Sequence, residues 1–130
     1  MKEIKVNFPA HFKKMFYKLG LSDDDLDDLE NQILEFENRR ERKDQLLGDL
    51  IPGTGGAIKF RFTSKDSKSG KSGAERIIYC AFNLKENLRE YNFLLCYAKN
   101  QKETLTNKEK QALKNTIKNI KDIRQKEYKL

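Results

Sequence analysis

The residues best suited to chemistry in this sequence are basic side chains between positions 59 and 99. Lys59 and Arg61 alternate with apolar residues in AIKFRFT, so on a strand they occupy one face. Arg76 opens a second apolar run, and Lys99 follows a third, just after Tyr97. In an antiparallel sheet these cations would converge on one concave side and hold a phosphodiester through arginine forks and lysine point charges. The loop between the first two runs adds three lysines: Lys65, Lys68 and Lys71.

Two kinds of chemistry fit such a cluster. Clustered cations lower a lysine pKa from its usual value of about 10.4, so that a neutral lysine could serve as a general base. Alternatively, the cations form a solvated positive face that binds nucleic acid without reacting with it. Composition and spacing leave both interpretations open.

Other catalytic arrangements find little support. Gly70-Lys71-Ser72 matches the end of a nucleotide-binding loop, but Lys65 stands where that loop needs glycine, and a strand-like run follows instead of a helix. The one histidine, His11, is expected at the surface or as a helix cap. Without a second histidine or a His/Cys cluster, we expect neither a catalytic triad nor a metal site, and no cofactor. The acidic run over residues 23–30 lacks the spacing of a calcium loop.

Composition favours a polyanionic partner. The chain has 130 residues, a net charge of +7 and a pI of about 9.4, and we expect one domain over residues 1–130. The charge is uneven: residues 22–50 carry four basic and eleven acidic side chains, whereas residues 51–130 carry eighteen basic and eight acidic ones. The basic surface therefore belongs mainly to the C-terminal part.

The cysteines and the N-terminal residues indicate the cellular compartment in which we expect the protein. Cys80 and Cys96 lie in apolar runs, which is typical of buried thiols in a reducing environment. The start of the chain lacks the apolar core of a signal peptide, and no run approaches the length of a membrane span. We expect a soluble, cytoplasmic protein with no membrane contact.

The N-terminal elements that must support the cations are a strand and two helices. KEIKVNF alternates as a short strand, and a helix follows from Pro9 to a stop at Gly20. Ser22 is a good N-cap for a second helix, which we expect to run to about Leu47 before Gly48. Together these helices form a hairpin that can cover one face of a sheet.

The C-terminal part predicts three strands and a helix. The strands are AIKFRFT, AERIIYCAF and YNFLLCYA, the last two joined by NLKENLRE as an antiparallel hairpin. Thr106 and Glu109 form a capping box for a helix that reaches about Gln125. The order predicts an α+β fold with a small, mostly antiparallel sheet of about four strands.

Several of these segments together resemble a known family. They are IPGTGGAIKFRF, a basic Gly/Ser loop, KSGAERIIYC and FLLCYAKNQKETLTNKEKQALK, which span about Asp49 to Lys121. The combination resembles the RelE/HigB-type toxins of bacterial type II toxin–antitoxin systems, within the RelE/ParE superfamily. The N-terminal strand and helical hairpin match that family in order and length.

The resemblance implies a microbial RNase fold and a ribosome-dependent endoribonuclease that cleaves mRNA without a metal. The 2′-hydroxyl of the RNA attacks the adjacent phosphorus and displaces the 5′-oxygen. A cognate antitoxin, a small helix-turn-helix protein, would neutralise the toxin.

By the same resemblance, Lys59 or Lys71 is the base or charge stabiliser, Arg61 and Arg76 clamp the phosphate, and Lys99 supports them. Lys65 and Lys68 would contact the RNA backbone, and Tyr97 or Tyr79 would stack on a base. Strict alternation places Arg76 and Tyr79 on opposite faces. Two other functions stay open: a gyrase-inhibiting toxin of the same superfamily, and a non-catalytic basic module that binds nucleic acid.

Overall fold

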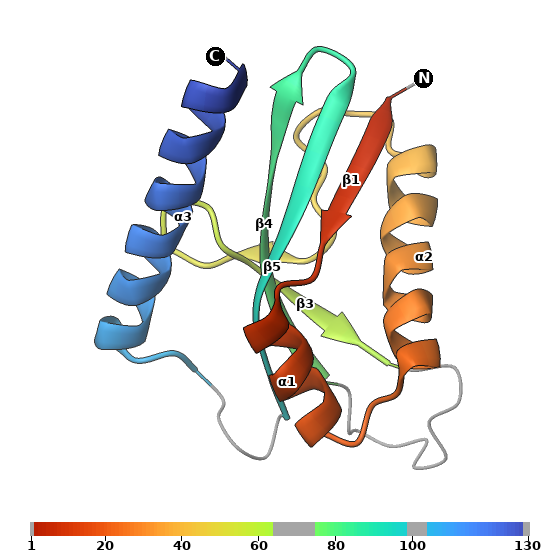
Figure 1. The fold of residues 1–130 in the computed structure, drawn as a ribbon, viewed down its shortest axis with the longest axis vertical. Helices are drawn as coiled ribbons and strands as arrows, with labels where there is room; N and C mark the ends of the chain where they lie inside the picture. Colours follow the sequence, from red (N-terminus) through yellow and green to blue (C-terminus); the bar gives the residue numbers. More distant parts are fainter. Residues whose placement is uncertain (1, 64–74, 99–103, 129–130) are drawn as a thin grey trace.

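A five-stranded mixed sheet runs through the computed structural model of the protein, which describes residues 2–63, 75–98 and 104–128 (Figure 1). In chain order the elements are β1 (Glu3–Asn7), α1 (Ala10–Lys18), α2 (Asp23–Arg39), β2 (Asp49–Leu50), β3 (Ile58–Phe62), β4 (Glu75–Lys85), β5 (Leu88–Ala98) and α3 (Asn107–Tyr128). The strands are arranged β1-β5-β4-β3-β2 in the sheet.

The predicted α+β class is confirmed, but the expected count of about four strands was wrong. β1 pairs with β5 in parallel, and the other three pairings are antiparallel. The additional strand is β2, whose two residues are too few for alternation to be visible in the sequence. It pairs with β3 because the loop between them turns the chain back, with the Ile51 amide donating to the Ala57 carbonyl at 2.9 Å.

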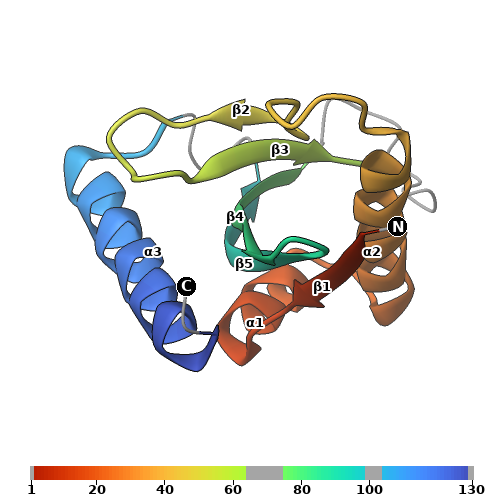
Figure 2. The same ribbon diagram turned by 90° about the horizontal axis from the view of Figure 1, so that it is seen from above.

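Helices cover both faces of the sheet (Figures 1 and 2). The helical hairpin of α1 and α2 lies on one face, as expected, and α3 lies on the other. On β3, alternation sends Phe60 into the core beneath α1 and α2, while Lys59 and Arg61 point to the α3 side. The core on the α3 side is formed mainly by Ala57, Ile78, Cys80, Leu94, Tyr97, Leu105, Leu113 and Ile117.

The start of α2 follows the sequence prediction, but its end does not. The Ser22 hydroxyl accepts from the Asp25 amide at 3.2 Å, and the Asp25 carboxylate accepts from the Ser22 amide at 2.8 Å. The helix ends at Arg39 rather than near Leu47, because Arg40 is extended. The next amides, of residues 41 and 42, donate to the side chain of Gln45 instead of helical carbonyls.

The hairpin of β4 and β5 is longer than the sequence suggested. Residues 83–90 were expected to form a loop, yet only Glu86 and Asn87 lie outside the two strands. A bulge interrupts the pairing, since Ile78 pairs with Leu95 and Tyr79 with Phe93. Leu94 is the extra residue, and the Nε2 N–H of His11 donates to its carbonyl at 3.1 Å.

The bulge decides which face each later residue of β5 occupies. Phe93 packs beneath α1, and without an extra residue Tyr97, four positions further on, would point the same way. With Leu94 inserted, Tyr97 joins the α3-side core instead. The bulge thus brings Tyr97 onto the face that carries Arg61 and Arg76.

A buried charge anchors α3, whose start at the Thr106–Glu109 capping box is as predicted. The Glu90 carboxylate on β5 is fully buried and accepts from Arg124 Nε at 2.8 Å and from Asn92 Nδ2 at 2.7 Å. Burial raises the pKa of Glu90, but these hydrogen bonds outweigh it, so the pKa lies below its usual 4.5. The helix is thereby fixed along the length of the sheet (Figure 1).

Candidate nucleic-acid interface

Three of the predicted site residues form one row across the sheet. Arg61 on β3 is paired with Arg76 on β4, and Arg76 is paired with Tyr97 on β5. Directly opposed residues on antiparallel strands point to the same face, with Cβ atoms about 5 Å apart. The row therefore spans about 10 Å on the side of the sheet that faces α3.

Lys59 extends the row along β3, two residues before Arg61 and on the same face. It lies opposite Asp49 of β2, and both residues line a pocket of about 240 Å³. Tyr97 and Lys110 line the same pocket, so it joins the row to the first turns of α3. The remaining lining residues are Leu50, Ile51, Pro52, Thr104 and Leu105.

The loop IPGTGG lines this pocket with Ile51 and Pro52 and is held in shape by its threonine. The Thr54 hydroxyl is buried, donates to the Ile51 carbonyl at 2.6 Å and accepts from the Ala57 amide at 3.0 Å. Before the loop, Gly48 has a φ of +112°, and a Cβ there would overlap the Lys59 carbonyl oxygen. The glycine is needed because the chain runs against the backbone of β3 at the position of Lys59.

Two arginines give the row its positive charge, and Asp49 is the acidic residue that lines the adjoining pocket. Arg61 is exposed and makes no ion pair within the described parts of the chain. The carboxylate nearest in sequence, Glu75, points to the opposite face with Ile77; burial raises its pKa, and Arg76 opposes that effect. An anion placed over the row would meet two guanidinium groups, which suits bidentate binding of phosphate oxygens.

The structure thus brings together the predicted residues that it describes: Lys59, Arg61, Arg76 and Tyr97. Lys65, Lys68, Lys71 and Lys99 lie outside the described residues. Tyr97 is 8% exposed and packs in the α3-side core, so a base can reach only the part of its ring that lines the pocket.

Tyr79 is a core residue rather than part of the row. It points to the α1–α2 side, as alternation predicted, and is 1% exposed. Its ring stacks on that of Tyr91 at 5.3 Å, and its hydroxyl donates to the Leu47 carbonyl. Base stacking is therefore left to Tyr97 among these tyrosines.

Two pocket residues, Asp49 and Lys110, were missed by the sequence reasoning. Asp49 directly precedes a segment rich in Pro and Gly, and Lys110 is one of several lysines in α3. Their position depends on the β2–β3 pairing and on where α3 packs, and neither leaves a periodic signal in the sequence.

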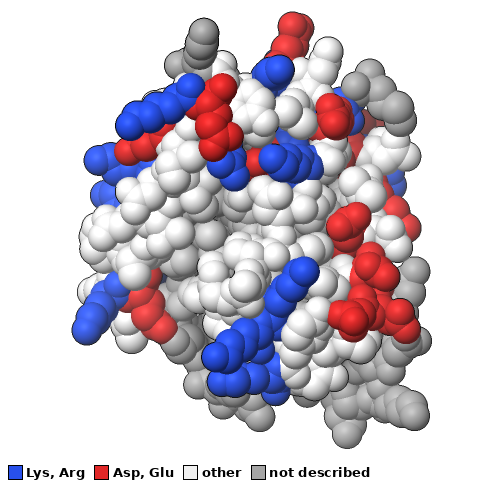
Figure 3. All heavy atoms as spheres, in the orientation of Figure 1, with Lys and Arg blue, Asp and Glu red and all other residues white. Residues whose placement is uncertain are grey.

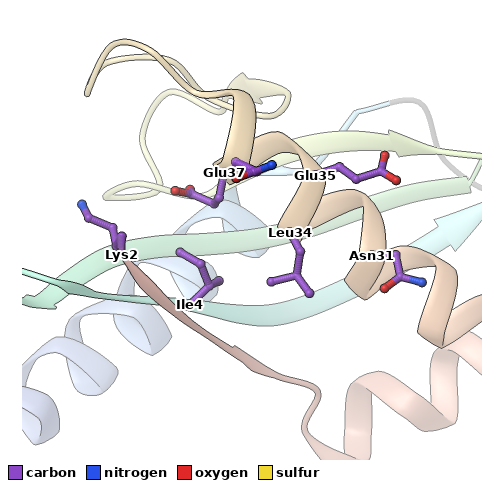
Figure 4. A pocket seen from close by; sticks show the side chains of 7 residues that line it. Lys2, Ile4, Asn31, Leu34, Glu35 and Glu37 are labelled. Atoms are coloured by element: carbon purple, nitrogen blue, oxygen red, sulfur yellow. The ribbon is translucent and has the colours of Figure 1, made fainter.

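A larger pocket lies elsewhere, between α2 and the edge strand β1 (Figure 4). It measures about 680 Å³; Ile4 and Leu34 face each other across it, with Lys2, Asn31, Glu35, Glu37 and Asn38 around them. Glu37 is engaged in the fold, since it accepts from Arg89 Nε at 3.0 Å and from the Tyr91 hydroxyl. This pocket lacks the clustered cations of the row, so we place the candidate interface at the smaller one.

On the face that Figure 3 shows, charge is segregated around α1 and the start of α2. Basic side chains gather over α1, and acidic side chains gather beside them over the first half of α2. The acidic residues of α2 lie across the sheet from α3, so they do not neutralise the row.

The two cysteines behave as core residues, as expected. Both are free and buried, Cys80 beneath α3 and Cys96 beneath α1 and α2. Burial raises the pKa of each thiol to about 12. Neither is poised as a nucleophile.

The described residues offer neither a metal-binding cluster nor a membrane-spanning helix. Over residues 2–63, 75–98 and 104–128, no group of three or more His, Cys, Asp or Glu side chains could hold a metal ion. None of the described helices is both long and apolar enough to span a membrane. No model of a known protein family matches the chain.

Proposed function

We propose that the protein is an RNA-cleaving toxin of the RelE/HigB type, acting as an endoribonuclease at the row of Arg61, Arg76 and Tyr97. The observation that carries the proposal is the direct opposition of two arginines on one sheet face, beside a pocket that contains Lys59. Like charges opposed on neighbouring strands destabilise a sheet, so their pairing favours a role in anion binding.

In this mechanism the scissile phosphate lies over the two guanidinium groups. A base takes the proton from the RNA 2′-hydroxyl, and the 2′-oxygen bonds to phosphorus while the bond to the 5′-oxygen breaks. The products are a 2′,3′-cyclic phosphate and a 5′-hydroxyl, which receives a proton from an acid. The arginines hold the extra negative charge that builds up on the phosphorane oxygens.

Two described residues are candidates for the proton transfers. Lys59 and Asp49 are paired on neighbouring strands and both line the pocket, so one could accept the 2′-hydroxyl proton while the other donates to the leaving oxygen. Asp49→Asn and Lys59→Gln should each lower the cleavage rate.

The resemblance supplies the remaining parts of the proposal. The substrate is mRNA on the ribosome, the partner is a helix-turn-helix antitoxin, and the compartment is the cytoplasm. The RelE-like topology is supported by the sheet order and by the helix pair packed opposite α3.

Induced expression tests the proposal. The wild-type chain should arrest growth and produce mRNAs cut within translated regions. Arg61→Ala and Arg76→Ala should abolish both effects while the purified variants keep the wild-type far-UV circular dichroism. Intact mRNA accompanied by DNA damage would favour a gyrase inhibitor instead, and normal growth with salt-dependent RNA binding would favour a binding module.

A further inference from the structure

A stripe of lysines runs along one side of α3 from the candidate pocket. Lys110, Lys114 and Lys118 are four residues apart and Lys121 follows three later, so they share a side of the helix next to its buried stripe. Lys121 lies eleven residues after Lys110, so the stripe is about 16 Å long. Lys114, Lys118 and Lys121 are exposed, and Lys110 is partly buried where it lines the pocket.

The two glutamates of α3 lie away from this stripe, whereas Asp122, four residues after Lys118, borders it. Glu109 and Glu127 are 18 residues apart, which is five full turns, so they lie on the same side of the helix. That side is rotated by about 140° around the helix axis from Lys114. Both are occupied: Glu109 accepts from the Thr106 amide at 2.9 Å, and Glu127 pairs with Arg124 at 3.1 Å. The stripe therefore keeps a net positive charge, with four lysines beside one aspartate.

Contacts with the sheet show which way the stripe faces. A Cβ built on Gly55, in the loop that lines the pocket, would lie 3.5 Å from Lys114 Cγ. Lys121 lies near enough to Cys80 of β4 for its charge to oppose the effect of burial on that thiol's pKa. The stripe thus starts at the pocket that holds Lys59, which Lys110 lines, and continues along α3 beside the residues that pack on the sheet.

We infer that this stripe is a track for the phosphates that flank the scissile linkage, so that a single RNA strand leaves the pocket along α3. The inference rests on the proposed function for the position of the scissile phosphate. It adds a substrate requirement: RNA long enough to reach past Lys110 binds more tightly than RNA that only fills the pocket. Lysines suit this role because they act as point charges with little demand on sequence or geometry.

Binding of single-stranded RNA to the full-length protein tests the track. The probes are oligonucleotides of about 4 and about 12 nucleotides, lengths within the usual range of single-strand binding sites. Both are 2′-O-methylated, so they lack the 2′-hydroxyl nucleophile and cannot be cleaved. The test variant is Lys114→Gln/Lys118→Gln. The matched control is Lys108→Gln/Lys126→Gln, which removes the same charge from the same helix, at an angle about 120° around the axis from Lys114.

The track predicts that the test variant binds the long probe about tenfold more weakly, since each exposed charge pair contributes up to roughly fivefold. The slope of log K against log salt should fall by about 1.4, because each lysine that neutralises a phosphate of a single strand adds about 0.7 to it. The short probe and the control variant should bind as the wild type does. Equal weakening in test and control, unchanged binding of the long probe, or equal weakening for both probe lengths would each overturn the inference.

The binding measurement, combined with a cleavage assay, separates this inference from the proposed function. If wild-type protein fails to cut mRNA but the length-dependent weakening is seen, the nuclease proposal fails and the track stands. If cleavage requires Arg61 but the test variant binds the long probe normally, the track fails and the nuclease stands.

Discussion

Arg61 of β3 lies directly opposite Arg76 of β4, on the face of the sheet toward α3. Opposed like charges lower the stability of a sheet, and an anion between the two guanidinium groups would reverse their repulsion. Stability and activity should therefore respond to the same residues in opposite directions.

Replacing Arg61 tests that opposition. Arg61→Gln should raise the free energy of unfolding by about 0.2–1 kcal/mol, because it removes one of two opposed charges at an exposed position. The same variant should cleave RNA about 100-fold more slowly. Urea unfolding and a cleavage assay measure the two effects, and Lys13→Gln on the exposed surface of α1 is the control for net charge. A variant that is both less stable and fully active would contradict the assignment.

Gly48 should be required for the position of Lys59. Gly48→Ala combines a positive φ with overlap against the Lys59 carbonyl, and the backbone of β3 must shift to relieve it. Gly20→Ala is a matched control, since Gly20 has a φ of +86° and open space around it. We expect Gly48→Ala to exceed the control in destabilisation by about 1–3 kcal/mol, the usual range for overpacking. Equal destabilisation in thermal or urea unfolding would show that the close approach is unimportant.

The Glu90–Arg124 pair should make the fold sensitive to acid. The pKa of Glu90 is lower in the folded chain than its usual 4.5, so its contribution is complete above about pH 4.5 and is lost as the pH falls below that value. Glu90→Gln should destabilise the protein by roughly 2–4 kcal/mol at pH 7, because Arg124 is left partly buried without its carboxylate. It should also flatten the decline in stability below pH 4.5.

An exposed ion pair provides the comparison for Glu90. Arg42 and Asp44 lie 3.4 Å apart with both side chains more than 70% exposed. Arg42→Gln should change the free energy of unfolding by less than about 1 kcal/mol, with the wild-type dependence on pH. If Glu90→Gln behaves like Arg42→Gln, the buried pair does not anchor α3.

The reactivity of the two thiols tests the packing on both sides of the sheet, since Cys80 lies on the α3 side and Cys96 on the α1–α2 side. With the pKa of Cys80 and Cys96 raised to about 12 from the usual 9.0, the thiolate fraction at pH 8 falls about a thousandfold. Native protein should resist iodoacetamide at pH 8, and both cysteines should react once urea unfolds the chain. Rapid labelling of either cysteine in the native protein would place that residue outside the core described here.

Local sequence patterns predicted the helices and strands, whereas long-range contacts determine where several of them end. Alternation identified β3 and its basic face, and Ser22 marked the start of α2 through a cap that needs only neighbouring residues. The end of α2 depends on Gln45 and on contacts of the following loop with β4, which no helical periodicity records. The bulge at Leu94 was invisible because YNFLLCYA is apolar on nearly every position, so a shift of one residue changes no pattern.

The same distinction applies to the site. The shared face of Lys59 and Arg61 follows from their spacing alone. The alignment of Arg76 with Arg61 needs the register of two strands, and that of Tyr97 needs the bulge. Lys110 enters the pocket only because α3 packs across the sheet.

Single-turnover cleavage of ribosome-bound mRNA by Arg61→Gln, Arg76→Gln and the double variant is the most direct test of the arginine clamp. Each single change should lower the rate about 100-fold, as expected when one group that stabilises transition-state charge is removed. The double variant should be slowed by less than the product of the two, because both groups act on one phosphate. Rates equal to those of Lys13→Gln would show that the opposed arginines do not hold the reacting phosphate.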